Sequence, residues 1–519
     1  MQKLPIGIQN FSNLRNDNFL YVDKTAKLLK LIESGSRYFL SRPRRFGKSL
    51  TISTLAAMFA GKVELFGGLA AEKWVEERSK KPLPVVRLDM SSLGRCKTSD
   101  DLNEAIIDEL KNIAEDYAVE IRESSSCERM LKNLLRSLNK GYGPVVVLID
   151  EYDKFILDNI NNLKKAEEMR EILRSFYGVL KSCDEYLSFV FITGISKFSK
   201  MGVFSAMNNL EDISLDEDYS DIVGYTQKEL EDNFAAWIES VSRKMKIEIN
   251  LFLEQLKDYY YGFSFDGKVK LYNPFSIMQC LKKAEFDNYW YVSGSSTFIV
   301  NYMKSHSISD PDTYRHFAVS ANFLDSHEIE KAKPESFLYQ SGYLTIEKRE
   351  NEQIILDYPN WEVYKSITRM YLEDIYRVDS YISLGSELWK TLSDGNISKA
   401  VELYNTALAA IPYEDFTHRD EYWYRSLFLM LLRGAGITAL GEVHTHKGRA
   451  DMLVKFPQMS LVLEFKFAEN SSEVEQKVAV GKRQMEDREY AKSYCLEGHN
   501  VITAVIVADD EKRTCTASL

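Results

Sequence analysis

Residue types suited to phosphate chemistry cluster at residues 42–49, which read Arg-Pro-Arg-Arg-Phe-Gly-Lys-Ser. This segment follows a short apolar run, Arg37–Ser41, and precedes a helical pattern. A phosphate-binding loop needs this strand–loop–helix order, because backbone N–H groups and a helix N-terminus then face the anion. Gly47 would let the backbone approach a phosphate, Lys48 would neutralise β- and γ-phosphate charge, and Ser49 would ligate Mg²⁺.

Arg42 stands where the first glycine of such a loop belongs, and Gly-Lys-Ser also occurs at ordinary helix starts. The loop alone therefore leaves a nucleotide site and an ordinary helix start as alternatives. Local charge favours the nucleotide site, because positive residues near a phosphate raise the local concentration of anions. In a chain of net charge −11, five such residues lie close together: Arg37, Arg42, Arg44, Arg45 and Lys48. The sequence leaves open whether Arg44 or Arg45 is an arginine finger.

Residues 144–153 read Pro-Val-Val-Val-Leu-Ile-Asp-Glu-Tyr-Asp, a buried-strand pattern that ends in carboxylates. Asp150 would hold Mg²⁺ through water, and Glu151 would orient or deprotonate the attacking water. A strand that ends in acids is often only a solvated edge, but here it completes a Walker A and Walker B arrangement. Thr193 ends the next apolar run and is a candidate γ-phosphate sensor, with capping of the following segment as the alternative.

Two carboxylates and a lysine near the end of the sequence have a D…ExK spacing. Asp451 opens one strand pattern, and Glu464 and Lys466 lie on the next. Alternate residues of a strand share a face, so Glu464 and Lys466 point the same way while Phe465 packs on the other side. Asp451 and Glu464 could hold Mg²⁺, and Lys466 could position or activate a water. The motif is short, and an amphipathic strand without a site is the alternative.

The elements that must position these residues alternate between strand and helix through residues 1–225. Strands are predicted at Arg37–Ser41, Pro84–Leu88, Val145–Ile149 and Phe189–Thr193. Helices are predicted near Leu50–Phe59, Asp101–Ile113, Glu128–Leu138 and Lys165–Lys181. This alternation predicts βαβ units and a mostly parallel sheet, an α/β fold.

Two further regions follow, which agrees with about three domains for a chain of 519 residues. Residues 226–412 are predicted to be a helical lid and linker. Their aromatic runs, Tyr259–Phe263 and Tyr289–Tyr291, are either core residues or base-stacking platforms, and the lack of interleaved basic residues favours core. Residues 413–519 are predicted to form a small α/β domain with a helix, two strands, a second helix and a third strand.

Composition excludes several protein classes. No apolar run approaches the roughly 20 residues that span a bilayer, and the first residues lack the apolar core of a secretory signal. The six cysteines form no CxxC pair, which favours free thiols in the cytoplasm. The net charge of −11 excludes a uniformly basic nucleic-acid coat but not a local basic site.

Four segments together resemble a bacterial AAA-ATPase-like family whose members carry a C-terminal PD-(D/E)xK nuclease-like domain. The segments are Phe19–Thr25, Ser41–Ser49, Leu148–Lys154 and Ala206–Leu215, and the resemblance continues through Tyr272–Ser276, Gln340–Ile346 and Tyr358–Asn360. The Arg-Pro-Arg-Arg loop is the P-loop variant of that family. The resemblance implies a P-loop sheet of the additional-strand type, with the Walker B and sensor strands adjacent, and a lid that closes over nucleotide.

The same resemblance adds candidates near the C-terminal motif. Glu442 matches the Glu-Val segment of the family and is a candidate third carboxylate, and Glu421 stands where such nucleases often carry a helical acid. Gln484 matches an Ala-x-x-Gln pattern, although Gly481 replaces its alanine. The remaining candidates, His444 and His446, are interpreted as exposed loop residues rather than metal ligands.

The sequence thus predicts an ATP-binding, ATP-hydrolysing P-loop protein coupled to an Mg²⁺-dependent nuclease that acts on DNA or RNA. The alternative is a nucleotide-dependent switch or scaffold whose inactive nuclease-like domain binds nucleic acid or a protein. A third reading makes both sites degenerate. The expected partners are ATP and nucleic acid rather than a membrane, and homo-oligomerisation is left open.

Overall fold

The fold is described from a computed structural model. It covers residues 1–159, 162–197, 203, 209–292, 303, 311–324, 333–350, 352–378, 381–411, 419–445, 447–494 and 500–519. These residues fall into two compact units, one from residues 1–299 and 314–363 and one from residues 300–313 and 364–519. The predicted boundaries after residues 225 and 412 stay predictions.

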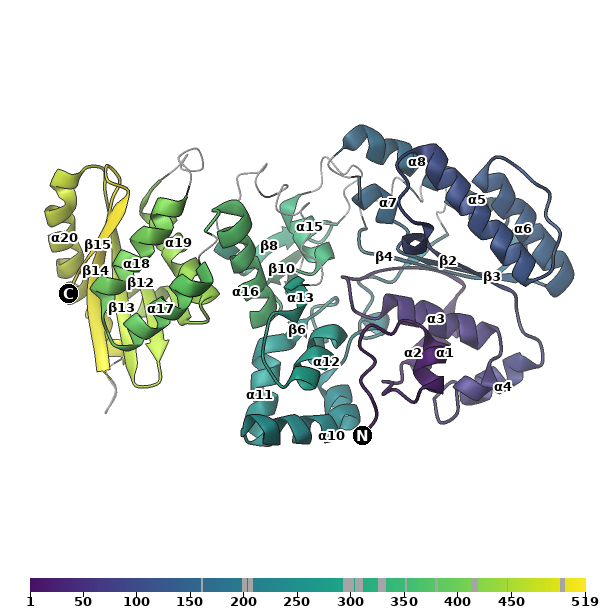
Figure 1. The fold of residues 1–519 in the computed structure, drawn as a ribbon, viewed down its shortest axis with the longest axis horizontal. Coiled ribbons are helices and arrows are strands. Elements are labelled where there is room, and N and C mark those ends of the chain that lie inside the picture. The colour runs from purple at the N-terminus through teal and green to yellow at the C-terminus, as the bar shows by residue number, and fades with distance from the viewer. Residues whose placement is uncertain are drawn as a thin grey trace. The chain divides into compact units, whose positions relative to one another are not determined.

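A five-stranded parallel sheet forms the centre of the first unit (Figure 1). Its strands are β1 (Arg37–Ser41), β2 (Val85–Asp89), β3 (Val145–Asp150), β4 (Leu187–Gly194) and β5 (Glu211–Asp212). The order β2-β3-β4-β1-β5 inserts β4 between β1 and β3, which confirms the predicted additional-strand arrangement. Every residue of β3 is buried, as expected for a central strand of a parallel sheet.

Helices cover both faces of this sheet (Figure 1). One layer consists of α5 (Ser99–Asp116), α6 (Cys127–Tyr142), α7 (Lys154–Leu157) and α8 (Leu163–Ser182). The other consists of α1 (Phe11–Asn16), α2 (Thr25–Ser34), α3 (Lys48–Phe59) and α4 (Glu72–Ser79). A capping box formed by Thr98 and Asp101 fixes the start of α5. The layers leave the carboxyl ends of β1, β3 and β4 at one edge, where the phosphate loop begins.

The rest of the first unit contains the predicted helices and also strands that the sequence analysis did not anticipate. The helices are α10 (Gln227–Met245), α11 (Ile249–Tyr260), α12 (Pro274–Lys283), α13 (Tyr289–Val292) and α15 (Pro334–Ser341). The strands are β6 (Tyr261–Phe263), β7 (Leu271–Tyr272), β8 (Phe317–Ser320), β9 (Thr345–Glu350) and β10 (Gln353–Asp357). The last three form an antiparallel sheet in the order β8-β10-β9. β8 and β10 are only four and five residues long, and β9 is largely polar, so each gives a weak strand signal.

The aromatic residues of this region belong to the core. Tyr260 is fully buried and its ring is stacked on Phe286, while Tyr289 and Trp290 are less than a tenth exposed. This burial confirms the core interpretation for these residues, because a base-stacking platform needs an open ring face.

The second unit is built on a mixed five-stranded sheet in the order β11-β12-β13-β14-β15. Its strands are β11 (Thr438–Thr445), β12 (Gly448–Phe456), β13 (Met459–Ala468), β14 (Asn500–Asp509) and β15 (Thr514–Ser518). Only the pairing of β13 with β14 is parallel. The sequence analysis missed β11 and β15, the two edge strands.

Helices complete this unit. They are α17 (Tyr381–Ser393), α18 (Ile397–Ala410), α19 (Glu421–Gly434) and α20 (Val474–Asp487), and α16 (Trp361–Met370) leads into the unit from the first one. Asn405 of α18 exchanges two hydrogen bonds with the backbone of Cys515, at 2.9 and 2.7 Å, so α18 is tied to β15. Throughout the part of the chain described, no helix combines the length and apolarity needed to cross a membrane.

Candidate functional site

The phosphate loop of the first unit connects β1 to α3 as the sequence predicts. Gly47 has a φ of +101°, a left-handed conformation that favours glycine, and it immediately precedes the first residue of α3. Lys48 is 6% exposed, and its Nζ donates hydrogen bonds to the carbonyl oxygens of Arg42 and Pro43, each at 2.9 Å. The ammonium is therefore held across the loop by its own backbone.

Two of the five clustered positive charges, Arg42 and Arg37, bind protein groups outside the loop. Arg42 is fully buried, donates to the Ser214 and Tyr219 carbonyl oxygens at 2.6 and 3.2 Å, and lies 4.0 Å above the Phe265 ring. Burial lowers the pKa of Arg42 to about 10. Arg37 forms an ion pair with Asp184 at 2.9 Å. The residue that replaces the glycine of the motif therefore anchors the loop to a neighbouring segment.

The carboxylates at the end of β3 lie beside this loop. Thr193 Oγ1 donates a 2.6 Å hydrogen bond to Asp150 Oδ1, which joins the predicted Walker B and sensor residues. Burial raises the pKa of Glu151, and the positive charge of Lys48 opposes that shift. Burial likewise lowers the pKa of Lys48, against the negative charges of Asp150 and Glu151. The three charged groups thus share one electrostatic environment.

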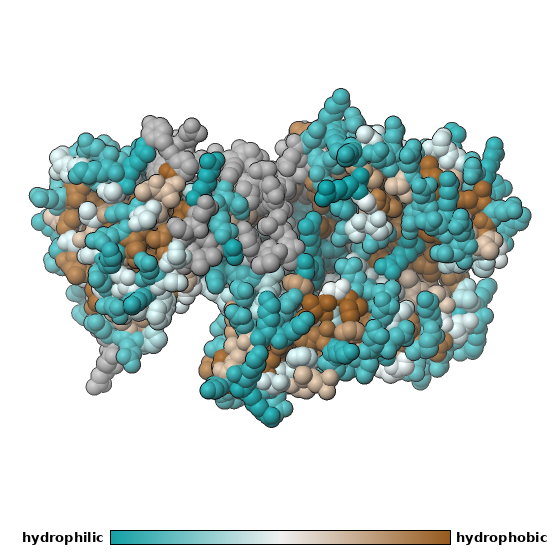
Figure 2. Space-filling model, in the orientation of Figure 1, coloured by the Kyte–Doolittle hydropathy of each residue, from teal (hydrophilic) through white to brown (hydrophobic). Residues whose placement is uncertain are grey.

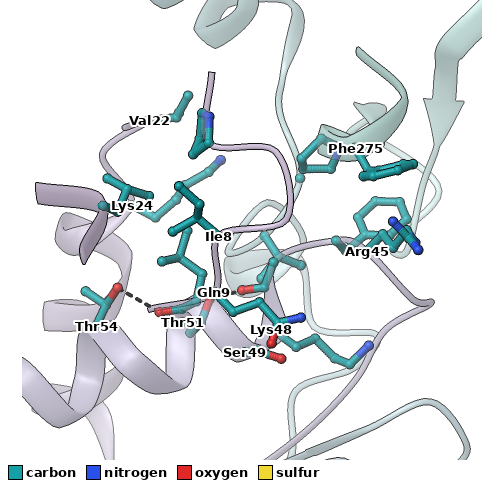
Figure 3. Close-up of a pocket in the computed structure, with 18 of the residues that line it drawn as sticks. Ile8, Gln9, Val22, Lys24, Arg45, Lys48, Ser49, Thr51, Thr54 and Phe275 are labelled. Atoms are coloured by element: carbon teal, nitrogen blue, oxygen red, sulfur yellow. Dashed lines mark hydrogen bonds between the residues drawn. The ribbon is translucent and has the colours of Figure 1, made fainter. Parts of the chain in front are cut away.

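A cavity of about 690 Å³ opens at this edge of the first unit (Figure 3). Of the predicted residues, six line it: Arg44, Arg45, Gly47, Lys48, Ser49 and Glu151. Asp150 and Thr193 are instead buried behind it. The remaining wall is largely apolar and comes mainly from the N-terminal segment, residues 222–225 and α12, including Pro5, Ile8, Val22, Phe275 and Met278. Figure 2 shows hydrophobic side chains gathering on this face in the region of α12 and the N-terminal segment.

Residues that the sequence analysis did not assign to the site support the loop from the start of α12. Asn273 Nδ2 donates to the Arg44 carbonyl oxygen at 3.5 Å, and the Arg45 guanidinium lies 3.9 Å above the Phe275 ring (Figure 3). Gly342 also packs against the loop, because a Cβ at this position would lie only 2.8 Å from Pro43 Cβ. The sequence analysis included the segments around Asn273 and Gly342 in the family resemblance. The sequence alone does not show that these segments contact the phosphate loop.

The donors of this site suit a hard divalent cation. Asp150 is 1% exposed, and among the described residues its Oδ2 has no hydrogen-bond partner. A buried carboxylate oxygen without a donor is unfavourable, and coordination to Mg²⁺ would satisfy it. Ser49, whose hydroxyl the sequence predicts as a second ligand, lines the cavity wall.

The second predicted constellation assembles on β12 and β13 of the other unit. The register brings Asp451 next to Glu464, because Met452 pairs with Leu463 and the Phe465 N–H donates to Asp451 Oδ2 at 2.8 Å. Lys466 Nζ donates to Glu464 Oε1 and to the Phe465 carbonyl oxygen, both at 2.7 Å. The side chain of Phe465 is fully buried. The strand alternation inferred from the sequence therefore brings the three polar groups together.

The electrostatics of this cluster are dominated by Glu464. It is 1% exposed, and its Oε2 has no partner within the described ranges. Burial, reinforced by the charge of Asp451, raises the pKa of Glu464 to about 7, against the hydrogen bond from Lys466. Burial would lower the pKa of Lys466, but the hydrogen bond that Lys466 donates to Glu464 and the negative charge of that carboxylate raise it overall. An unpartnered buried carboxylate oxygen beside Asp451 again suits a hard cation.

Two candidate acids and an unpredicted arginine complete the cluster. Glu421 lies 3.8 Å from Lys466 Nζ, and burial raises the pKa of this carboxylate. Glu442 faces Asp451 across β11 and β12, since its neighbours Gly441 and Val443 pair with Met452 and Ala450. Arg425 of α19 donates to both, at 2.9 Å from Glu442 Oε1 and 3.1 Å from Asp451 Oδ1. Nothing in the local sequence signals this bridge, because it joins residues 17 and 26 positions apart.

The remaining candidates on α20 and in the turn have other surroundings. Gln484 Nε2 donates to the Tyr490 hydroxyl at 3.3 Å. A Cβ at position 481 would lie 2.5 Å from a Val505 methyl group, so the glycine permits close packing of α20 on β14. His446 and the side chain of His444 lie outside the described residues.

Comparisons with known proteins agree with both assemblies. A family model described as a predicted AAA-ATPase matches residues 5–204, and a model of the PD-(D/E)XK nuclease superfamily matches residues 419–517. An uncharacterized protein in the vnfD 5′ region of Azotobacter chroococcum mcd 1 is 33% identical over 511 residues, covering 96% of this chain and 95% of that protein. The chain belongs to this AAA-ATPase-like family with a C-terminal nuclease-superfamily domain.

Family membership confirms the resemblance inferred from the motifs and covers both sites. The AAA-ATPase-like match contains the phosphate loop and the ends of β3 and β4, and the nuclease-superfamily match contains β11 to β14. The P-loop fold of the first part supports a nucleotide-binding protein.

Two solved structures from Aeropyrum pernix also resemble the chain weakly. The ORC1 protein in complex with DNA has a TM-score of 0.24 at 12% identity and covers 83% of this chain and 88% of its own. The ORC2 protein, in ADPNP–ADP complexes, has a TM-score of 0.26 at 8% identity and covers 67% and 92%. TM-scores this low define no shared arrangement of the whole chains.

Proposed function

We propose that the first unit binds and hydrolyses ATP with Mg²⁺, and that the second unit cleaves phosphodiester bonds of DNA or RNA in a metal-dependent reaction. The observation that carries the proposal is that each unit brings a lysine and acidic side chains from separate elements into one partly buried cluster. Each cluster also contains a buried carboxylate oxygen that lacks a hydrogen-bond donor among the described residues.

In the ATP site, Lys48 leaves the carbonyl oxygens of the loop to hold the β- and γ-phosphates, and the N-terminus of α3 faces the same anion. Arg44 and Arg45, at the cavity wall, add positive charge, and either one is the candidate arginine finger. Ser49 and Asp150 would hold Mg²⁺, which would supply positive charge against the phosphates. Glu151 orients the attacking water. Thr193 is the γ-phosphate sensor and responds to the phosphate through the hydrogen bond that it donates to Asp150.

In the nuclease-like site, Asp451 and Glu464 are the ligands of the metal. When bound, Mg²⁺ would stabilise the negative charge that develops on the phosphate and lower the pKa of the attacking water. Lys466 positions that water, because its ammonium is held in place by hydrogen bonds to the Glu464 carboxylate and the Phe465 carbonyl oxygen. Glu421 and Glu442 extend the donor set at the rim.

A matched pair of assays tests both halves on the intact chain. ATP turnover and cleavage of labelled DNA and RNA are measured for wild type, Lys48→Ala and Lys466→Ala, with the exposed lysine variants Lys62→Ala and Lys455→Ala as controls. Lys48→Ala should lose ATP turnover, and Lys466→Ala should lose cleavage but keep ATP turnover. Absence of cleavage by wild type with ATP and Mg²⁺ would overturn the nuclease half.

A second candidate function is a nucleotide-dependent switch whose nuclease-like domain binds nucleic acid or a protein without cleavage. The observation that favours it is that Arg425 already pairs with Asp451, a predicted metal ligand. Gel-shift binding that survives Asp451→Ala, in the absence of any cleavage, would select the switch.

The proposal places the protein in the cytoplasm. The described cysteines are free thiols, namely Cys96, Cys127, Cys183, Cys280 and Cys515, which suits a reducing compartment. Cell fractionation followed by immunoblotting checks this location, and recovery with a secreted or membrane fraction would contradict it.

A further inference from the structure

Arg425 lies at the centre of the acidic cluster in the second unit. Its side chain is 11% exposed, and one guanidinium spans two strands by donating to Glu442 on β11 and Asp451 on β12. Both Asp451 oxygens are thereby engaged by the protein, since the Phe465 N–H donates to the other one. A cation that coordinates Asp451 must therefore compete with a donor that is already in place.

The charges of the cluster are nearly balanced by this chain alone. Four carboxylates form ion pairs with three cationic side chains of the same chain. The carboxylates are Glu421, Glu442, Asp451 and Glu464, and the cations are Arg425, Arg449 and Lys466. Like charges this close disfavour one another, so each cation stabilises the assembled strands. A divalent ion added to this set would leave an excess of positive charge.

We propose that Arg425 competes with the divalent metal for Asp451, and that a phosphate of the nucleic acid accepts the released guanidinium, so that metal and nucleic acid bind cooperatively. This inference rests on the proposed metal-dependent nuclease and specifies how its site is loaded. Metal that binds without nucleic acid must break the hydrogen bond between Arg425 and Asp451. This step is unfavourable, because the largely buried guanidinium then has no anion to replace Asp451.

A nucleic-acid phosphate provides that partner. Guanidinium groups bind phosphate through two parallel hydrogen bonds, so the free energy lost at Asp451 is recovered at the substrate. Tyr422, whose ring centre lies 5.2 Å from the Arg425 guanidinium carbon, is 45% exposed, so a phosphate can approach this end of α19 from solvent once the guanidinium leaves Asp451. Linkage then requires that nucleic acid strengthen metal binding by the same factor by which metal strengthens nucleic-acid binding.

Calorimetric titration of the full chain with Ca²⁺ tests the competition without reading catalysis. Ca²⁺ prefers the same oxygen donors as Mg²⁺. Arg425→Gln should bind Ca²⁺ about tenfold more tightly than wild type, a typical coupling factor. The matched control is Arg449→Gln, which removes a 53% exposed arginine paired with Glu442 but not with Asp451, and should change the affinity less than about threefold. Equal or weaker Ca²⁺ binding by Arg425→Gln would overturn the competition.

The same titration with a short single-stranded DNA, verified as intact on a gel afterwards, tests the cooperativity. DNA should tighten Ca²⁺ binding to wild type by about tenfold and to Arg425→Gln by less than about twofold. If Arg425→Gln fails to fold by circular dichroism, Arg425→Lys replaces it, because a single ammonium cannot span both carboxylates and should show an intermediate affinity. An equal effect of DNA on wild type and variant would overturn the proposal, whereas no Ca²⁺ binding by any variant would overturn the metal-dependent nuclease as well.

Discussion

Each unit holds a nearly buried lysine, but the two are held in opposite ways. Lys48 donates to two carbonyl oxygens of its own loop, and the carboxylates of β3 influence it only through space. Lys466 donates directly to the carboxylate of Glu464. A lysine held by neutral groups can be given up to an incoming anion, whereas a lysine paired with a carboxylate fixes the geometry of a negatively charged cluster. The first site is therefore suited to receive an anion and the second to receive a cation.

The two sites also differ in how they are supported. The phosphate loop is held by residues far away in the sequence, including Ser214, Phe265, Asn273 and Gly342. The acidic cluster follows mainly from strand register between neighbouring strands. Changes in distant packing should thus alter the first site more than the second.

The largest effect is expected from Lys48→Ala. Removing the ammonium leaves the phosphates without their principal positive partner, so ATP affinity should fall by roughly 10³-fold, about 4 kcal/mol. Calorimetric titration with ATP measures this change, with Lys62→Ala as the control. Ca²⁺ binding by the second unit should stay within about twofold of wild type. If Lys48→Ala also lost Ca²⁺ binding by the second unit, the two sites would not bind their anion and cation independently.

The next effect concerns Glu362, a fully buried carboxylate of the first unit. Burial raises the pKa of Glu362 to about 8, although the Trp290 N–H, which donates at 2.8 Å, opposes that shift. The folded protein therefore holds this proton more tightly than the unfolded chain, so stability is lost as pH rises from about 4.5 to about 8. Glu362→Gln should be more stable than wild type at pH 9 by on the order of 3 kcal/mol and similar to it at pH 4.

Urea unfolding at both pH values, monitored by tryptophan fluorescence, measures this difference. The control is Glu350→Gln, an exposed glutamate on β9, which should leave the pH dependence unchanged. A variant at position 362 that keeps the pH dependence of wild type would assign that dependence to another group.

A smaller effect is expected from a pair of glycine substitutions, one in each unit. Gly342 has a φ of +89° and abuts Pro43 of the loop, and Gly481 packs on Val505. Each added methyl group should cost about 1–3 kcal/mol of unfolding free energy. Because only Gly342→Ala displaces the phosphate loop, it alone should weaken ATP binding, by about tenfold. Comparable ATP affinities in the two variants would contradict the dependence of the loop on distant packing.

The smallest effect is expected from Phe275→Leu. This change removes the aromatic face beneath the Arg45 guanidinium, an interaction of about 0.5–1 kcal/mol at a partly exposed position. ATP affinity should fall about threefold, and Phe275→Tyr should restore it. In an Arg45→Met background the same substitution should have no effect, which a double-mutant cycle detects.

The sequence predicts the strongly patterned parts of this molecule. The buried strand β3 and the loop before α3 carry their own signals, an apolar run and a Gly-Lys-Ser segment. Glu464 and Lys466 are also predictable, because strand alternation is a local rule. Asp451, Glu442 and Glu421 could be named as candidates, but their distances to one another could not.

What the sequence does not predict comes from contacts between distant segments. Arg42 is part of the basic cluster by composition, yet the structure turns it to the Ser214 and Tyr219 carbonyl oxygens. Arg425 is an ordinary helical residue in the sequence, and only the pairing of β11 with β12 gives it two carboxylate partners. The edge strands β11 and β15 were missed because their sequences are less apolar than those of the central strands.

The discontinuous make-up of the second unit affects how the protein can be dissected. Its residues come from 300–313 as well as 364–519, and Arg433 of α19 forms an ion pair with Asp312 at 2.8 Å. Asn405 is bound to the backbone of Cys515. A fragment that starts near residue 413 would therefore lose both partners and expose the surfaces that they cover. We therefore expect the nuclease-like part of the chain to fold stably only together with the segments that supply Asp312 and Asn405.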